Sequence, residues 1–419
     1  MTEAALAVLR GLPGVALLLL IGVLCSTDRR RIAPRTVLAA LLMQFGLAAL
    51  ILFVPPGRWA LARASEVVNA VLDFGTHGTA FLFGPLVGGR MPELFPDSGG
   101  FVFALRVLPQ IVYVSALIGL LYHWGVMQLL ARVLGSGLRR LLGTTRIESF
   151  SAVSTIILGQ SEMPVAIKPF VPILTRAELF AVMSSGTASV AGSVLAGYAG
   201  LGVPLPFLLA ASIMAIPGGL LFAKLLVPTV EPSRVRSLDA AFDGKRAANL
   251  FEAVAAGANN GLRVAVAVGV MLLAFIGLIA LLDGAVALLG SAVGLPHLSL
   301  EYLLGQVFRP LAWAIGVSWA ESGTVGGVIG QKLVFNEFVA YVQLSPIIHA
   351  HALSTHALAI ASVALCGFAN FASIGILLAT YDAIAPARRA EVALLGLRAV
   401  LAGTLSNLLS ATIAGMFIP

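Results

Sequence analysis

Residues 149–173 read SFSAVSTIILGQSEMPVAIKPFVPI, an apolar stretch that a polar group, GQSEMP at residues 159–164, interrupts. Neither apolar arm is long enough for a helix, which rises about 1.5 Å per residue, to cross a hydrocarbon core about 30 Å thick. Irregular backbone at membrane depth is tolerated only where it is buried in protein or faces a cavity. The stretch therefore predicts a re-entrant helical hairpin with a polar tip.

A second stretch, residues 318–344, repeats this design. It reads SWAESGTVGGVIGQKLVFNEFVAYVQL, with Asn336 and Glu337 at its tip. About thirty residues after each tip, a long apolar span is itself interrupted, by SVAGS at 189–193 and by GFANFAS at 367–373. Paired, interrupted segments in the two halves of a chain indicate a transporter whose binding site lies near the middle of the membrane.

The composition supports a membrane protein. Of 419 residues, 59% are hydrophobic and 11% are charged, with a mean hydropathy of +0.99. An average soluble protein is about 25% charged, so soluble enzymes, secreted disulfide scaffolds and disordered proteins are excluded. The two cysteines imply no disulfide framework. The net charge of +7 does not point to nucleic-acid binding, because Lys and Arg residues of a membrane protein collect in its cytoplasmic loops.

Apolar runs of about 20 residues predict eight spans. They lie near 5–25, 36–54, 107–131, 177–199, 205–226, 262–283, 357–380 and 392–417. Basic residues concentrate in the loops after the first, third, fifth and seventh spans, which should therefore be cytoplasmic, and both termini should be periplasmic. The first hairpin then enters from the inside and the second from the outside, as inverted copies.

We therefore predict an all-α polytopic membrane protein with eight transmembrane helices and two re-entrant hairpins in inverted repeats. Amphipathic interfacial helices are expected over 58–74 and 247–258. Four regions follow: N-terminal scaffold spans and an interfacial helix (1–131), a first transport-domain repeat (132–230), a cytoplasmic loop with an interfacial helix and a scaffold span (231–300), and a second transport-domain repeat (301–419).

Two carboxylates at membrane depth need an explanation. An acidic residue there costs about 2.5 kcal/mol or more and is a functional candidate by default. Glu162 and Glu337 could instead cap helix N-termini at the hairpin tips. A functional role is favoured because Gln160, Asn336, Asn370 and Ser373 should converge on the same place, where they suit a polyhydroxylated, uncharged solute. Lys332 is a candidate partner for a carboxylate.

Three motifs resemble those of the concentrative nucleoside transporters: GQSEMP with KPF at 168–170, KLVFNEFVAY at 332–341, and CGFAN at 366–370. The resemblance runs from about residue 30 to the C-terminus. It implies a bacterial inner-membrane homotrimer in which each subunit moves a nucleoside, with Na⁺ or H⁺, by an elevator-like step of a mobile transport domain. It implies no other cofactor and no enzymatic activity.

The family's site residues map onto this sequence by motif. Those that contact or line the nucleobase pocket match Gln160, Ser161, Glu162 and Val194. Those that hold the ribose hydroxyls match Glu337, Asn370 and Ser373, with Phe368 lining the same pocket. These ribose roles make chemical sense, since a carboxylate accepts hydrogen bonds from vicinal hydroxyls, whereas Asn and Ser both donate and accept.

The coupling site is where the sequence departs from the family. Sodium-coupled members have Asn at the position of Thr155; the other ligands would be the Leu158 and Val190 carbonyls and the Ser189 hydroxyl. A threonine oxygen is a poorer cation ligand than an amide carbonyl, so we favour H⁺ over Na⁺. The natural proton carrier would be a carboxylate that desolvation keeps protonated, Glu337 or Glu162.

Alternatives remain open at this point. The same fold could couple to Na⁺, or could carry a nucleobase or modified nucleoside. A membrane-embedded hydrolase would need histidines near Glu162 and Glu337, but the sequence places them in loops or at span ends. A passive channel would need a continuous polar stripe, whereas the polar residues gather at one level. Uphill uptake separates a symporter from a channel, and product analysis would reveal a hydrolase.

Overall fold

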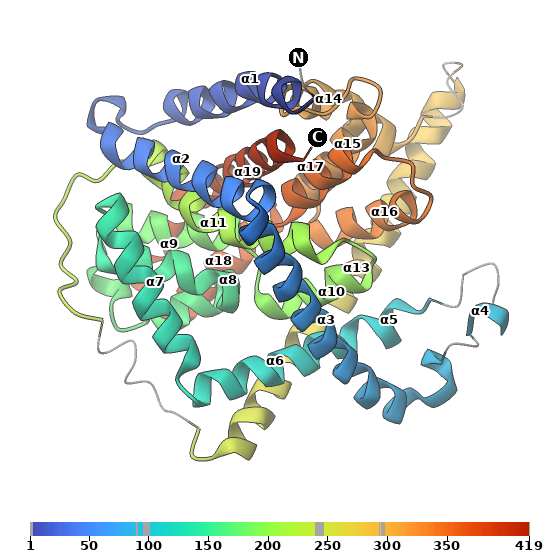
Figure 1. Ribbon diagram of the computed structural model, residues 1–419, viewed down its shortest axis with the longest axis horizontal. Coiled ribbons are helices and arrows are strands. Elements are labelled where there is room, and N and C mark those ends of the chain that lie inside the picture. The colour runs from blue at the N-terminus through green and yellow to red at the C-terminus, as the bar shows by residue number, and fades with distance from the viewer. Residues whose placement is uncertain are drawn as a thin grey trace.

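The computed structural model describes residues 3–88, 91–94, 101–238, 247–292, 294 and 298–418 (Figure 1). Within these ranges the regular structure is helical, with no β-strand, so the predicted all-α class is confirmed. The main helices are α1 (Glu3–Leu24), α2 (Pro34–Ala48), α3 (Pro55–Phe83), α4 (Met91–Leu94), α5 (Phe103–Arg106), α6 (Leu108–His123), α7 (Val126–Leu142), α8 (Arg146–Ala166), α9 (Arg176–Ala188), α10 (Gly192–Gly200), α11 (Leu205–Leu226), α13 (Leu250–Ala292), α14 (Leu300–Ala314), α15 (Ser322–Val334), α16 (Glu337–His349), α17 (Thr355–Leu365), α18 (Ala372–Ile384) and α19 (Arg389–Phe417).

The predicted spans are helical. In the described ranges, six segments are long and apolar enough to cross a membrane: Pro34–Phe53, Phe103–His123, Arg176–Gly200, Leu205–Leu226, Leu250–Ser291 and Pro386–Phe417. Three shorter apolar helices, Val8–Leu24, Thr355–Leu365 and Ala372–Ile384, correspond to the first predicted span and to the two halves of the seventh.

The third span is shorter than the predicted 107–131. Helix α6 ends at His123, and Gly125, with φ of 78°, turns the chain into α7. Glycine is the residue that adopts this left-handed conformation without steric cost. Helix α7 is amphipathic and buries one face, made of Met127, Ala131, Gly135, Leu138 and Leu142. This helix was not predicted, because its arginines are typical of a cytoplasmic loop.

Both predicted hairpins are present as two helical arms joined by a break. In α8 the break is Gly159, whose φ of 76° and ψ of −179° are not helical. In the second hairpin, α15 ends at Val334 and α16 begins at Glu337. The interrupted spans are also broken as predicted: residues 189–191 separate α9 from α10, and 366–371 separate α17 from α18.

Helix α13 differs from the prediction of a separate interfacial helix over 247–258 and a span over 262–283. The structure joins them in one helix of 43 residues. No proline interrupts this stretch, and Gly257 and Gly261 pack closely against α6. A Cβ atom at either position would lie 2.6 Å from an atom of Ser115, so small residues allow the two helices to approach as they do in membrane helix pairs. The other predicted interfacial segment, 58–74, lies within α3.

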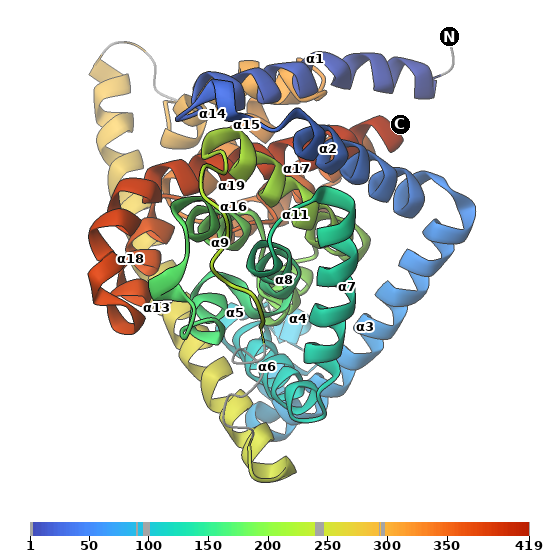
Figure 2. The ribbon, with the colours of Figure 1, turned by 90° about the vertical axis from the view of Figure 1, so that its left-hand side faces the viewer.

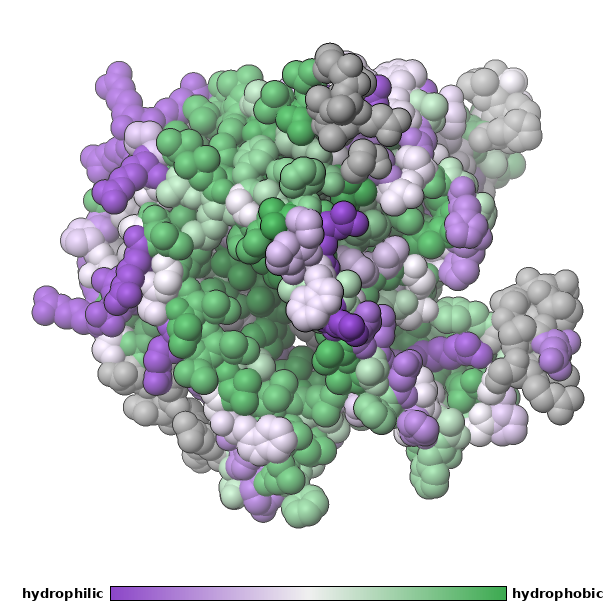
Figure 3. Space-filling model, viewed as in Figure 1, coloured by the Kyte–Doolittle hydropathy of each residue, from purple (hydrophilic) through white to green (hydrophobic). Residues whose placement is uncertain are grey.

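The helices form a buried central group and a peripheral group. The most apolar 18 residues of each long segment differ in burial. In Arg176–Gly200, which contains α9 and α10, 83% of these residues are buried, whereas in the segments that contain α6 and α13 only 17% are buried. Figure 2 shows α3 and α13 as the two sides of a V closed by α6, with α8, α9 and α11 between them. Hydrophobic side chains cover much of the face in Figure 3, as expected of a surface that contacts lipid.

Candidate substrate-binding site

Both hairpin tips and both breaks in the interrupted spans line one cavity of about 300 Å³. All eight residues predicted to bind substrate line it: Gln160, Ser161, Glu162, Val194, Glu337, Phe368, Asn370 and Ser373. Helix α13 completes the wall with five apolar residues that the sequence analysis did not identify: Val264, Ala267, Val268, Met271 and Leu272. A pocket with apolar walls and a few convergent polar groups is typical of a small-molecule site.

Glu337 is the first residue of α16, and both of its carboxylate oxygens accept hydrogen bonds that orient the side chain. Asn336 caps this helix, because its Oδ1 accepts a hydrogen bond from the Val339 backbone N–H at 2.9 Å. Oε1 of Glu337 accepts from the Tyr198 hydroxyl at 3.1 Å, and Oε2 accepts from Asn370 Nδ2 at 2.9 Å. Glu337 as a whole is 5% exposed, lies at a helix N-terminus that favours negative charge, and contributes to the cavity wall.

The break between α17 and α18 is ordered by its own side chains. Asn370 Oδ1 accepts from the Ser373 backbone N–H at 2.9 Å, and Ser373 Oγ donates to the Phe368 carbonyl at 2.5 Å. Gln160 Nε2, from the first hairpin, donates to Ser373 Oγ at 3.0 Å. Among the described residues, Gln160 Oε1 and Asn336 Nδ2 are buried without a hydrogen-bond partner. A buried unpaired polar atom is costly, so these two atoms are available to a polar ligand.

The first hairpin tip approaches the break in the first interrupted span. A Cβ atom on Gly159 would lie 2.9 Å from Ala191 Cβ, so only glycine fits without displacing the neighbouring chain. Glu162 accepts a hydrogen bond from Asn260 of α13. Asn260 and Tyr198 were both missed by the sequence analysis. Each lies within a helix and contacts a carboxylate only through the tertiary fold, so no local sequence signal marks it.

Of the four predicted coupling residues, Thr155 and Leu158 lie on the first arm of α8, and Ser189 and Val190 lie in the break after α9. Leu158 lines the cavity, whereas Thr155, Ser189 and Val190 are buried. The Thr155 hydroxyl donates to the Ala152 carbonyl at 3.1 Å, and the Ser189 hydroxyl donates to the Ser185 carbonyl at 2.9 Å. In the described part of the chain, no group of three or more His, Cys, Asp or Glu side chains could hold a metal ion.

Lys332 does not form the ion pair with a carboxylate that the sequence suggested. Its Nζ donates to the Ala364 carbonyl and to Asn407 Oδ1, both at 2.7 Å. Among the described residues, no ion pair involving Lys332 is present. The side chain is almost fully buried, on α15 four residues before the second hairpin tip.

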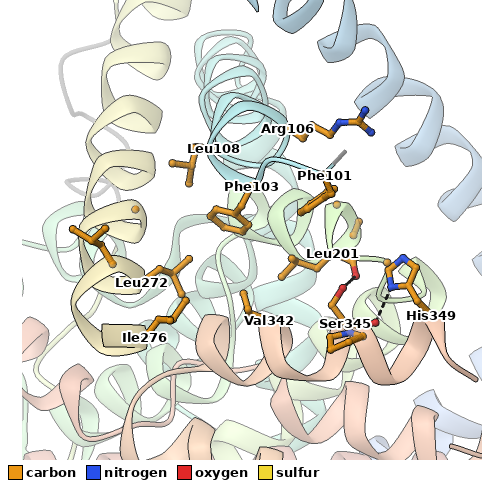
Figure 4. Close-up of a pocket in the computed structure, with 17 residues that line it drawn as sticks. Phe101, Phe103, Arg106, Leu108, Leu201, Leu272, Ile276, Val342, Ser345 and His349 are labelled. Carbon is orange, nitrogen blue, oxygen red and sulfur yellow. Dashed lines mark hydrogen bonds between the residues drawn. The ribbon is translucent and has the colours of Figure 1, made fainter. Parts of the chain in front are cut away.

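A second, larger cavity of about 1030 Å³ adjoins the first and shares Leu272 with it (Figure 4). In Figure 4, Phe103, Leu272, Ile276 and Val342 surround its interior, and Ser345 and His349 of α16 lie at one end. Phe338 lines the smaller cavity and Phe103 the larger, and their ring centroids are 6.2 Å apart in an edge-to-face contact. This aromatic pair lies between the two cavities.

Comparison with known families gives three matches along the chain. Residues 13–86 match the N-terminus and residues 207–415 the C-terminus of the Na⁺-dependent nucleoside transporter family. Residues 104–205, which include the first hairpin and the first interrupted span, match the Gate domain, described as nucleoside recognition.

Individual relatives match over nearly the whole chain. The nucleoside permease NupC of Helicobacter pylori is 44% identical over 408 residues, covering 97% of this chain and 96% of that protein. The solved structure of CNTnw in an inward-facing, substrate-bound state is 51% identical with a TM-score of 0.93, covering 98% of both chains. A variant of CNTnw in an outward-facing state is 50% identical with a TM-score of 0.95, covering 99% of both chains.

These relatives are transporters and not enzymes, which confirms the prediction of a transporter over a hydrolase. The matched family models and the lengths over which the relatives match agree with the resemblance drawn from the sequence. The chain belongs to the concentrative nucleoside transporter family.

Proposed function

We propose that this protein imports nucleosides by symport across a bacterial inner membrane, with H⁺ as the coupling ion. The observation that carries the proposal is the Glu337–Asn370–Ser373 set, in which an oriented carboxylate, an amide and a hydroxyl converge on one small cavity. Vicinal ribose hydroxyls would donate to the Glu337 carboxylate and accept from Asn370. A cavity of about 300 Å³ suits a small ligand of this kind.

The nucleobase would lie against the first hairpin. Gln160 supplies the buried, unpaired Oε1, and Ser161 and Glu162 line the same wall. An amide oxygen and a hydroxyl can complement the donors and acceptors on the edge of a base. Val194 and Phe368, also in the wall, would cover its faces. A nucleobase alone would leave the Glu337 side of the cavity unfilled, so a complete nucleoside is favoured as the solute.

The choice of H⁺ over Na⁺ as the coupling ion rests on Thr155. Its hydroxyl is engaged with the carbonyl of the preceding turn, and it offers one oxygen on a short side chain. An amide at this position would extend a carbonyl oxygen further from the helix. We therefore assign H⁺ as the coupled ion, with Glu337 or Glu162 as its carrier. Na⁺ is the alternative, because the Ser189 hydroxyl and the Leu158 and Val190 carbonyls would remain as ligands.

The transport step would be an elevator-like movement of the central helices against α3, α6 and α13. Support comes from the division into a buried group and a peripheral group, and from the wall that α13 lends to the cavity. The close α6–α13 contact at Gly257 and Gly261 would keep the peripheral group rigid. We place both termini in the periplasm, from the distribution of basic loops, and we expect a homotrimer of such subunits.

The experiment is uptake of radiolabelled uridine and adenosine into proteoliposomes under imposed gradients: a pH gradient alone, a sodium gradient alone, or neither. Accumulation above equilibrium with the pH gradient alone is the expected result. Accumulation with sodium alone would replace H⁺ by Na⁺ and leave the nucleoside site in place. Folded, reconstituted protein that accumulates no nucleoside with any gradient would refute the proposal.

A further inference from the structure

The two repeats carry different residues at one equivalent position. Thr155 precedes the break residue of the first hairpin, Gly159, by four positions, and Lys332 precedes Asn336 of the second hairpin by four. Ser189 directly follows α9, as Cys366 directly follows α17. Thr155 and Ser189 are 34 residues apart, and so are Lys332 and Cys366. Lys332 therefore stands in the second repeat where Thr155, a proposed coupling residue, stands in the first.

The ammonium group of Lys332 lies among helix C-termini. Ala364, whose carbonyl accepts from Nζ, is in the last turn of α17. Asn407 of α19, the second acceptor, donates in turn through Nδ2 to the Ala188 carbonyl at 2.6 Å and to the Cys366 carbonyl at 3.2 Å. Lys332 and Asn407 thus connect the C-terminal ends of both half-helices, α9 and α17.

The chemistry at this place is that of a monovalent cation site. The last carbonyls of a helix have no intrahelical donors and carry the negative end of the helix dipole. Buried in this way, they require a cation or a set of donors. The ammonium group of Lys332 is a compact cation with three donors, and two of these are directed at oxygen atoms 2.7 Å away.

We infer that Lys332 is a built-in cation of the second repeat, whose ammonium group holds the break between α17 and α18 in shape as a bound cation would hold the break after α9. This assignment rests on the proposed function for the role of the first-repeat site. A charge fixed to the protein travels inward with the loaded transport domain and outward with the empty one. It therefore adds no net charge to a transport cycle.

Lys332 does not line the cavity and is a positioning residue: it orients the segment that carries Asn370 and Ser373. If it acted only as a helix cap, any neutral replacement would weaken the protein equally in every salt. If it stands in for a bound cation, a small polar replacement would open a site that an external cation can fill. The two roles therefore predict different results: only the second makes the stability of such a variant depend on which cation the salt contains.

The test uses purified full-length protein without nucleoside, with the thermal midpoint measured in LiCl, NaCl, KCl and N-methylglucamine chloride at equal ionic strength. Lys332→Asn places at this position the amide that sodium-coupled members of the family carry at the equivalent position of the first repeat. We expect at least one small cation to raise its midpoint in a saturable manner, beyond the effect on the wild-type protein. Lys332→Met, the matched control, fills the space with an apolar chain and should show no such selectivity. A Lys332→Asn midpoint that is the same in all four salts would overturn the inference.

A second comparison covers the case in which Lys332→Asn does not fold. Lys332→Arg keeps the positive charge, and Lys332→Met keeps the length without it. We expect uridine binding to weaken by less than about threefold in the arginine variant and by about tenfold or more in the methionine variant, since removing a hydrogen-bonded charge costs more than moving it. Equal affinities in the two variants would overturn the inference. Failure of uptake under every gradient would refute the proposed function but would leave the salt experiment, which involves no transport, unaffected.

Discussion

Gln160 donates a hydrogen bond to Ser373 Oγ, 3.0 Å away, although 213 residues separate the two in the chain. The bond joins the tip of the first hairpin to the break in the second interrupted span. Ser373 Oγ donates its own hydrogen to the Phe368 carbonyl, so it is oriented to accept from Gln160. The proposed base-binding and ribose-binding sides of the cavity are therefore connected before any substrate arrives.

Replacing Gln160 by alanine should weaken nucleoside uptake and change the ranking of the bases. The substitution removes the bond to Ser373 and the unpaired Oε1, each worth about 1 kcal/mol, so about a fivefold to thirtyfold loss is expected. Competition of uridine uptake by cytidine, adenosine and guanosine measures the ranking. Gln44→Ala is the matched control, since Gln44 donates to Ser410 Oγ at 2.8 Å and does not line the cavity. An unchanged ranking in Gln160→Ala would separate the first hairpin from base recognition.

Glu337→Gln should abolish accumulation of uridine while leaving a folded protein. The amide has the same shape, but its NH₂ group would face the donors of Tyr198 or Asn370, and it can no longer serve as a charged acceptor. Charge-assisted hydrogen bonds contribute about 1.5–3 kcal/mol. Tyr198→Phe removes a single neutral donor and should reduce uptake by about fivefold. Size-exclusion profiles check the fold, and normal uptake by Glu337→Gln would disprove its role.

The sequence predicted the hairpins, the breaks and the polar residues at the hairpin tips because each depends on a local signal. Val194 was assigned to the site only through the resemblance to the family. Glycine, proline and polar groups inside apolar runs mark where a helix must stop, as Gly159 does in α8. It did not predict Tyr198 or Asn260 as partners of the carboxylates, nor Asn407 as the partner of Lys332. These pairs come from elements far apart in the chain. A tyrosine or asparagine within a helix looks the same whether or not it meets such a partner.

Thr155→Asn should make uptake depend on sodium. Asparagine supplies the amide oxygen that sodium-coupled members of the family carry at this position, in addition to the Leu158 and Val190 carbonyls and the Ser189 hydroxyl. Uridine accumulation under a sodium gradient, with no pH gradient, measures the effect. Thr155→Val, nearly the same size and without the hydroxyl, should show no sodium dependence. If wild-type protein already accumulates uridine with sodium alone, the assignment of H⁺ is wrong.

Gly261→Ala should destabilise the protein by about 1–3 kcal/mol, as expected of overpacking at a tight contact. The new Cβ would lie 2.6 Å from Ser115 Cβ and 2.7 Å from Val112 Cα, forcing α6 and α13 apart. Gly277→Ala, on the same helix with nothing within 4 Å of its Cβ position, is the control. It should be neutral or slightly stabilising, because alanine is the better helix former. Thermal midpoints of the two purified variants provide the comparison, and equal midpoints would contradict the close-packing argument.

Helix α13 has 43 residues and, at about 1.5 Å per residue, is about 64 Å long. A helix of about 20 residues is enough to cross a hydrocarbon core about 30 Å thick, so α13 must either be steeply inclined or extend well beyond the bilayer. Mismatch between a hydrophobic helix and its bilayer is accommodated largely by tilt. Because α13 also forms one wall of the cavity, a change in tilt would move that wall relative to the hairpins. Lipid chain length should therefore influence the affinity and rate of transport, which makes the thickness of the host membrane a determinant of nucleoside uptake.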